Sequence, residues 1–326
     1  MNISIVESTD RYRVLCEEQP TIPLFSQAWW LDAVVGPEQW SVVLALRGEE
    51  VVGALPYFCN SRWGMTFFTQ PPLTQTLGPW MRTSEAKYAK ALAMEKDVLG
   101  ALADGLPEFA LYRQNWDWAR TNWLPFYWKG FEQTTRYTYV LPDISDPDAL
   151  WQGVQKDIRG NIRKASNRFG VQVRFADDIG ELFPVLRKTF DRQGKQLPFA
   201  EEFLYRVDRV ASEQGKRAIV LGEDGEGQLH AGTYIVWEGN RAYQLLNGYD
   251  PELRQSGAGS LCVWSAIQKA AEHVGRYDFE GSMLEPVERF FRAFGAAQTP
   301  YFRVQRTDSR ILRLAECGRN LLRKGC

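Results

Sequence analysis

Residues 254–259, Arg-Gln-Ser-Gly-Ala-Gly, have the types and spacing of an anion-binding turn. A strand is expected before them at 241–248, and a helix after them at 260–273. Glycines at such a junction leave backbone N–H groups accessible, and the helix N-terminus adds partial positive charge. An ordinary loop into a helix is the alternative interpretation. We expect a phosphate-bearing cofactor to bind the following residues: Arg254, Gly257, Ala258, Gly259 and the N–H of Ser260.

The elements that follow the turn favour the anion-binding interpretation. The pattern predicts a short strand at 277–282, a helix at 285–295 and a strand at 300–305. This order resembles the GNAT acyltransferase superfamily. There the equivalent loop holds the pyrophosphate of coenzyme A, and a splay between the flanking strands admits the pantetheine arm. The resemblance implies an acyl-CoA co-substrate, either acetyl-CoA or a longer acyl-CoA.

Three motifs narrow the resemblance to one branch. They are W-x4-K-D-I-R-G-N-I from Trp151, D-F-E-G-S from Asp278 and F-F-R-A-F-G from Phe290. Over residues 150–305 they resemble the FemABX-like group of tandem acyltransferases. Some members transfer amino acids from aminoacyl-tRNA to peptidoglycan precursors, and others use acyl-CoA. The aminoacyl-transferring members have a lysine where this chain has Phe291, which favours acyl-CoA and leaves tRNA-dependent aminoacyl transfer as the alternative.

Acyl transfer to an amine requires a base for the amine and an acid for the leaving group. Asp278 and Glu280 alternate along the expected strand 277–282, so both carboxylates are predicted on one side. Burial there would raise the pKa of a carboxyl toward the working range. A structural role in pairing with arginines is the alternative for both. Tyr249 is the candidate acid, with Tyr301 or water as the alternatives.

The acceptor is expected to contact a basic helix that opens the second half. Lys156 and Arg159 lie on one face of it, and the resemblance places Arg159 against an anionic acceptor. Arg292, which follows the position of the family lysine, joins this set. Trp116 lies in an aromatic run that suits sugar or amide-bearing ligands, although core packing is the alternative. The expected acceptor is a small molecule or a sugar or peptide precursor.

The two halves of the chain share a plan. An apolar hairpin is expected at 42–58 and again at 218–237, and each half closes with an aromatic helix and a strand. This predicts an α/β fold with mixed α+β sheets, built as two tandem GNAT-like acyl-CoA N-acyltransferase folds. Residues 1–142 would form a degenerate domain with an acceptor groove, because Pro79 and Trp80 replace the glycine turn. Residues 148–326 would hold the single CoA-type loop.

Composition sets the remaining expectations. The 326 residues include 39 basic and 40 acidic side chains, so net charge gives no general attraction to nucleic acid or membrane. The five cysteines are widely spaced, which predicts reduced thiols and no metal site. Without a signal-like N-terminus or a long apolar run, a cytoplasmic location is expected. The basic C-terminal tail predicts a docked helix, with tRNA or anionic-membrane contact as the alternative.

These features point to one activity. The favoured function is N-acyl transfer from an acyl-CoA to an amine on a cell-envelope or polysaccharide precursor. A non-catalytic envelope-precursor binder remains the rival from another class, because neither the family lysine nor a tyrosine occurs in the helix 285–295.

Overall fold

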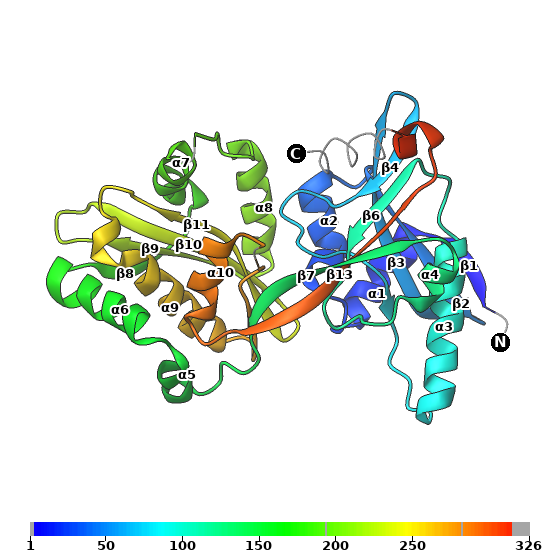
Figure 1. Cartoon of the computed structure of the whole chain (residues 1–326), viewed down its shortest axis with the longest axis horizontal. Coiled ribbons are helices and arrows are strands. Elements are labelled where there is room, and N and C mark those ends of the chain that lie inside the picture. Colours follow the sequence, from blue (N-terminus) through cyan, green and yellow to red (C-terminus); the bar gives the residue numbers. More distant parts are fainter. Residues whose placement is uncertain (1–2, 193, 282, 315–326) are drawn as a thin grey trace. The chain divides into compact units, whose positions relative to one another are not determined.

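The computed structural model describes residues 3–192, 194–281 and 283–314. They form two compact units, each considered by itself (Figure 1). Unit 1 comprises Met1–Arg136 and Pro300–Cys326, and unit 2 comprises Tyr137–Thr299. These units differ from the expected ranges 1–142 and 148–326, because the end of the chain belongs to unit 1.

Unit 1 is a mixed sheet with helices on both faces. Neighbouring strands follow the order β1-β2-β3-β4-β6-β13, with β5 paired to β3. The pairs are antiparallel except β4 with β6, which is parallel. The elements of unit 1 are β1 (Ser4–Glu7), α1 (Thr9–Glu18), η1 (Leu24–Ser26), α2 (Ala28–Val35), β2 (Trp40–Arg47), β3 (Glu50–Arg62), β4 (Met65–Thr69), β5 (Trp80–Met81), α3 (Tyr88–Asp104), β6 (Leu111–Asn115) and α4 (Leu124–Trp128).

Strand β2 shows how the sheet of unit 1 is buried on both sides. Val43 and Ala45 pack on the α3 side, whereas Val42 and Leu44 pack on the α1 and α2 side. Alternate side chains of a strand point to opposite faces, so one apolar run supplies two cores.

Unit 2 has a second mixed sheet with the order β7-β12-β11-β10-β9-β8. Only β11 with β12 is parallel among these pairs. Its elements are α5 (Pro147–Gly153), α6 (Lys156–Phe169), β8 (Gln172–Ala176), η2 (Ile179–Leu182), α7 (Phe183–Asp191), α8 (Glu201–Glu213), β9 (Arg217–Glu223), β10 (Leu229–Glu238), β11 (Arg241–Tyr249), η3 (Arg254–Ser256), α9 (Ala258–Ala271), β12 (Tyr277–Asp278) and α10 (Glu285–Arg292).

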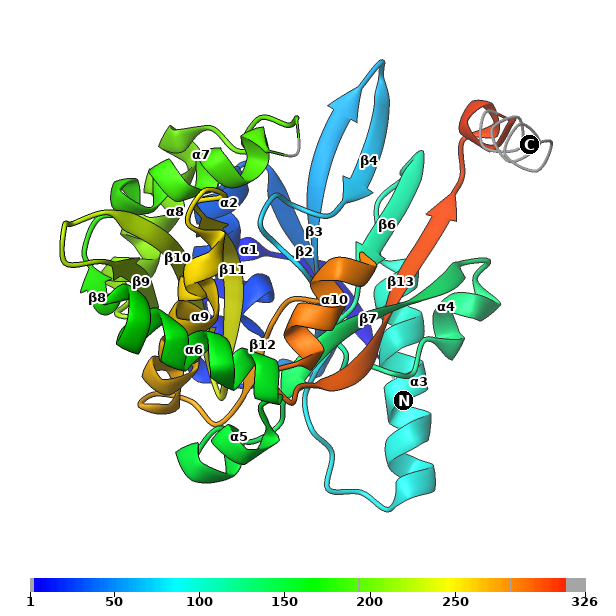
Figure 2. The same ribbon diagram turned by 60° about the vertical axis from the view of Figure 1, so that its left-hand side comes forward.

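Helices α6 and α9 lie side by side on one face of this sheet (Figures 1 and 2). Helix α6 buries Ile158, Ile162 and Ala165, a spacing that places them on a single helical face. It ends where Gly170 adopts a left-handed φ of 63°, which glycine accepts without steric cost. The apolar core of unit 2 therefore fixes the helix that packs against the turn before α9.

Two strands, β7 (Glu132–Leu141) and β13 (Ala297–Thr307), pass from one unit into the other. In unit 2, β7 pairs with β12 through Leu141↔Tyr277. In unit 1, β13 pairs with β6 from Arg303↔Asn115 to Thr307↔Leu111. The closing strand of each half of the chain thus completes the sheet of the other half. Sequence periodicity predicted both strands but not this exchange.

Candidate functional site

The predicted anion-binding turn lies at the N-terminus of α9 in unit 2. Gly257 is the residue before the helix, with a left-handed φ of 83°. A Cβ at this position would lie 2.5 Å from the carbonyl oxygen of Asn161 in α6. At Gly259 a Cβ would meet no heavy atom within 4 Å. Gly257 is therefore required by the fold, whereas Gly259 borders open space that a ligand could use.

The backbone N–H groups of this turn are not equally available. The N–H of Ala258 donates to Ser256 Oγ (3.2 Å), and that of Ser260 donates to the Gly257 carbonyl (3.0 Å). Within the described residues, the N–H of Gly259 has no hydrogen-bond partner. An approaching anion therefore meets one unsatisfied donor in the first helical turn, where the helix dipole is most positive.

Arg254 supplies a positive charge three residues before Gly257. It is exposed at the start of η3 and, in the part of the chain that the structure describes, forms no ion pair. The structure thus brings together Arg254, Gly257 and Gly259 as the sequence predicted. It also assigns the Ala258 and Ser260 N–H groups to internal bonds, which the sequence did not reveal.

The neighbouring strands separate as the family resemblance implied. Parallel pairing of β11 with β12 is confined to Ala242↔Tyr277 and Tyr243↔Asp278. Strand β11 continues to Tyr249 along β10, whereas the chain after Asp278 follows β7, with the Phe279 N–H donating to the Tyr139 carbonyl (3.0 Å). The backbones of β11 and β12 therefore diverge after Tyr243 and Asp278, and this divergence of the two strands is called the opening.

Glu280 lies at this divergence in an unusual backbone conformation. Its φ is 58°, a left-handed value that is uncommon for a residue with a side chain. The residue is half-buried, and its Oε1 is shielded from solvent. Burial, and then the nearby charge of Asp278, raise the pKa of Glu280 well above the usual value. A shielded carboxyl with a raised pKa is a candidate for general acid–base catalysis.

Asp278 has a different environment from Glu280. Its Oδ1 accepts hydrogen bonds from Thr138 Oγ1 (2.5 Å) and from the Glu280 N–H (2.9 Å). The prediction of one strand through residue 282 was wrong, because β12 ends at Asp278. The alternation that placed both carboxylates on one side therefore does not apply. Asp278 holds the bend that presents Glu280, and Ser282 lies outside the described residues.

Tyr249, the predicted acid, is the last residue of β11. Its hydroxyl accepts a hydrogen bond from Arg192 Nη1 (2.8 Å), and its backbone N–H donates to Thr189 Oγ1 (2.8 Å). The ring is half-buried. The structure thus fixes the hydroxyl beside a cation at the far end of the strand that borders the opening.

The predicted acceptor residues on α6 and α10 occupy the surface of unit 2. Lys156 is exposed at the first turn of α6, and Arg159 Nη1 donates to the Trp151 carbonyl (3.2 Å). Arg292 on α10 forms an ion pair with Glu288 (2.8 Å). Arg159 is half-buried, and its bond to the Trp151 carbonyl connects α6 to α5. Any role of Arg159 in acceptor binding would therefore be in addition to this structural contact.

Trp116 is part of the core of unit 1. Its side chain has no exposed surface and packs edge-on against Phe126, with ring centroids 4.8 Å apart. Gly78 approaches the same ring so closely that a Cβ there would lie 2.7 Å from it. This burial argues against the predicted contact with an acceptor and favours the core-packing alternative.

Sequence reasoning missed two polar residues that shape the opening. Thr138 bonds Asp278, and Gln244 Oε1 accepts from the Tyr277 hydroxyl (2.7 Å) at the point where β11 and β12 part. Both are buried. The sequence could have indicated Gln244, because a glutamine between apolar residues of a predicted strand is expected to be buried. Buried amides are normally hydrogen-bonded for a structural or functional reason.

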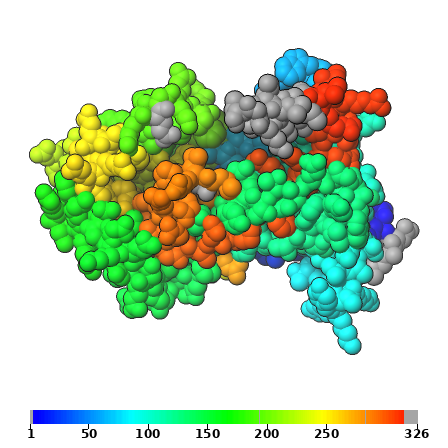
Figure 3. All heavy atoms as spheres, viewed as in Figure 1, coloured from blue at the N-terminus to red at the C-terminus, as the bar shows by residue number. Residues whose placement is uncertain are grey.

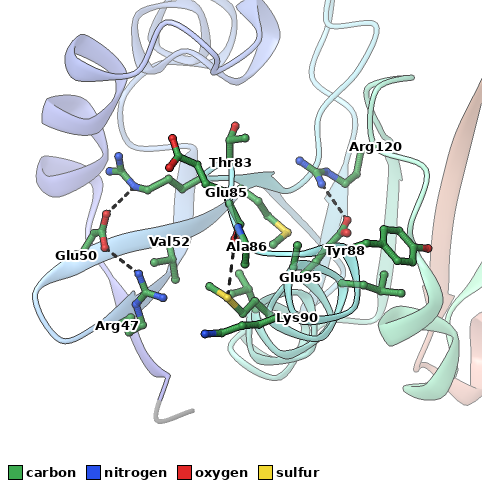
Figure 4. Close-up of a pocket in the computed structure, with 17 residues that line it drawn as sticks. Arg47, Glu50, Val52, Thr83, Glu85, Ala86, Tyr88, Lys90, Glu95 and Arg120 are labelled. Atoms are coloured by element: carbon green, nitrogen blue, oxygen red, sulfur yellow. Dashed lines mark hydrogen bonds and ion pairs between the residues drawn. The ribbon is translucent and has the colours of Figure 1, made fainter.

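Unit 1 contains a cavity of about 680 Å³ between the segment after β5 and the first turns of α3 (Figure 4). Its lining includes Val52, Met81 and Met94. Glu50 pairs with both Arg47 (3.3 Å) and Arg82 (3.1 Å), and Arg120 pairs with Glu95 (3.1 Å). A second cavity of about 750 Å³ lies in unit 2 beside α8. None of the predicted site residues lines either one.

The comparisons with known proteins agree with this geometry. The acetyltransferase (GNAT) domain family matches residues 152–313. This segment is a GNAT acyltransferase domain. The match includes the turn at Gly257, the opening after Tyr243 and the segment that carries Glu280, so the acyltransferase assignment rests on the part of the chain that holds the candidate site.

Solved structures extend the similarity to the tandem fold. The crystal structure of FemX has 13% sequence identity and a TM-score of 0.66, covering 93% of this chain and 97% of FemX. L-PGS from Bacillus licheniformis has 12% identity and a TM-score of 0.55, covering 96% of each chain. A tandem GNAT protein from the clavulanic acid biosynthesis pathway has 11% identity and a TM-score of 0.53, covering 93% of this chain and 98% of that one. The predicted tandem GNAT-like fold is confirmed.

No curated protein sequence matches the chain. No helix in the described ranges of the acyltransferase is long and apolar enough to cross a membrane. Among the residues described, no group of three or more His, Cys, Asp or Glu side chains could hold a metal ion.

Proposed function

We propose that this acyltransferase moves an acyl group from an acyl-CoA to an amine on a cell-envelope or polysaccharide precursor. The observation that carries the proposal is the turn at Gly257–Gly259 at a helix N-terminus. Among the described residues, the Gly259 N–H has no hydrogen-bond partner there, Arg254 forms no ion pair, and a Cβ at Gly259 would meet open space. The diphosphate of CoA would bind there, and the pantetheine arm would enter where β11 and β12 diverge.

Glu280 is the proposed base. The amine nitrogen attacks the thioester carbonyl carbon, a C–N bond forms and the C–S bond breaks. Glu280 removes the proton from the amine, directly or through a water, and the departing thiolate of CoA takes up a proton. The left-handed bend at Glu280 and the bonds of Asp278 to Thr138 and to the Glu280 N–H would hold the carboxyl in place.

A single donor site per chain is part of this proposal. In unit 1 the segment after Pro79 forms β5, in which Trp80 and Met81 pair with Ala54 and Gly53 of β3. Backbone groups committed to a ladder cannot form an anion-binding turn. The donor is therefore assigned to unit 2 alone, and unit 1 is assigned a part in acceptor binding in addition to Arg159.

Transfer from aminoacyl-tRNA is the second candidate function, and the similarity to the fold of FemX supports it. The absence of a lysine at Phe291, with that side chain buried in the core of unit 2, favours acyl-CoA. The fold likeness would suit an acceptor such as a peptidoglycan precursor. If the protein were instead a non-catalytic binder of an envelope precursor, it would not turn over the donor. Substitution of Glu280 would then have no effect on a reaction rate.

Calorimetric titration of the full chain with acetyl-CoA and a longer acyl-CoA tests the proposal. It predicts saturation at one acyl-CoA per chain. Two equivalent sites would contradict the division of roles between the units, and binding of aminoacyl-tRNA without binding of any acyl-CoA would favour the second candidate.

A further inference from the structure

The hairpin between β3 and β4 ends in an unusual turn in unit 1. Arg62 pairs with Met65, so Trp63 and Gly64 form a two-residue loop. Their φ values are 52° and 70°, the left-handed pattern of a turn that favours Asn-Gly. A tryptophan in this region is strained, yet its side chain is 84% exposed. Since the fold buries little of the ring, the strained backbone at Trp63 is consistent with a contact made outside the fold.

A second group of exposed apolar side chains lies at the same edge. The helical residues 310–314 begin after Ser309, whose Oγ accepts from the Leu312 N–H (3.4 Å). Ser309 Oγ also lies 3.8 Å from the sulfur of Met65 in the hairpin. Ile311 is 72% exposed and Leu314 is 74% exposed. In Figures 1 and 3, the light-blue hairpin and these red residues reach the surface close together.

This edge is also basic. Arg62, Arg310 and Arg313 are all exposed. Of the acids in the adjoining segments, Asp308 pairs with Arg306 (2.8 Å), and Glu108 is exposed in the loop before β6. Residues 315–326 lie outside the described part, but their sequence adds three basic residues, Arg319, Arg323 and Lys324, and one acid, Glu316. Positive charge and exposed apolar side chains thus occur together.

We propose that this hairpin–helix surface, defined by Arg62, Trp63, Arg310, Ile311, Arg313 and Leu314, docks on the surface of an anionic lipid bilayer. Tryptophan favours the headgroup level, isoleucine and leucine insert below it, and arginines attract anionic lipids. An RNA partner would use the arginines, but the exposed aliphatic side chains cannot stack on bases. The inference goes beyond the proposed function and is independent of the donor.

Vesicle co-sedimentation of the full chain tests the docking surface. Phosphatidylcholine vesicles with and without phosphatidylglycerol are compared for the wild type, Trp63→Asn and Trp128→Ala. Trp128 is the control, because it is 61% exposed in α4 and lies outside the proposed surface. The wild type and Trp128→Ala should bind the phosphatidylglycerol vesicles alike, and Trp63→Asn should bind them about tenfold more weakly.

Thermal melting separates docking from folding in the same variants. Asparagine suits the left-handed position, so Trp63→Asn should keep or raise the melting temperature while it loses vesicle binding. A double variant, Arg310→Gln with Arg313→Gln, should weaken binding and reduce its dependence on salt. Equal vesicle binding by Trp63→Asn and the wild type would overturn the proposal. Binding of tRNA with no binding of anionic vesicles would also overturn it and identify an RNA surface.

Discussion

A Cβ at Gly257 would lie 2.5 Å from the carbonyl oxygen of Asn161, so the turn before α9 is fixed by its contact with α6. Gly259, two residues later, has open space instead. One glycine of the motif thus serves the fold, and the other leaves room for a ligand. The distinction allows the structural and binding roles of a single motif to be tested separately.

Alanine substitutions should show opposite effects on stability at these glycines. Gly257→Ala forces a side chain into a left-handed, crowded position and should lower the free energy of unfolding by about 1–3 kcal/mol. Gly259→Ala should leave it unchanged or raise it by up to about 1 kcal/mol, because alanine favours the helix. Urea unfolding of both variants measures the difference. Equal losses of unfolding free energy in the two variants would show that Gly257 and Gly259 do not differ in their structural roles.

Glu280→Gln should lower turnover by roughly 10²–10⁴-fold with little change in acyl-CoA affinity, as expected for loss of a general base. Wild-type turnover should increase with pH as Glu280 deprotonates, and the variant should lack this dependence. Glu288→Gln is the matched control, because Glu288 is paired with Arg292, which lowers its pKa. Unchanged turnover in Glu280→Gln would return Glu280 to a structural role.

The raised pKa of Glu280 also predicts how stability depends on pH. The folded chain holds this proton more tightly than the unfolded chain. The resulting stability is fully present below the ordinary pKa of about 4.3 and is lost as pH rises through the folded pKa. Relative to the wild type, Glu280→Gln should therefore become more stable as pH increases. Denaturant unfolding at acidic and alkaline pH measures this, and a difference that does not change with pH would contradict the raised pKa.

Arg159→Ala should raise the KM for the acceptor by very roughly tenfold to a hundredfold and leave the KM for the donor unchanged. A charge-assisted contact contributes on the order of 1.5–3 kcal/mol, which corresponds to that range. Arg163→Ala is the control, because Arg163 lies over the Trp151 ring at 5.6 Å. Melting temperatures of both variants would show any loss of stability that comes only from removing their contacts with Trp151. Equal and small effects on KM would rule out the acceptor role.

The exchange of closing strands predicts which unit a core substitution destabilises. Val304 on β13 is fully buried in unit 1, whereas Val220 on β9 is fully buried in unit 2. Each change to alanine should cost roughly 2 kcal/mol. Hydrogen exchange should show faster opening of β6 in Val304→Ala and of β10 in Val220→Ala. If both variants loosened only unit 2, the expected sequential domains 1–142 and 148–326 would be correct.

The sequence predicted most elements because their signals are local. Glycine spacing located the turn before α9, and apolar periodicity located the hairpins in both halves. The bend at Glu280 was not predictable, since the alternating residues 277–282 are typical of an extended strand and carry no local signature of a left-handed glutamate. The strand exchange was also hidden, because periodicity defines a strand but not its partner. Trp116 could be assigned to the core only from its packing, and the tail beyond residue 314 lies outside the described residues.

Gly259→Val tests most directly whether the turn at Gly259 binds acyl-CoA. A bulky side chain would fill the open space while leaving the contact of Gly257 with Asn161 intact. Titration calorimetry of acetyl-CoA should show weaker binding by the variant than by the wild type, with folding confirmed by an unchanged unfolding transition. A folded Gly259→Val protein that binds acetyl-CoA as tightly as the wild type would contradict the donor assignment.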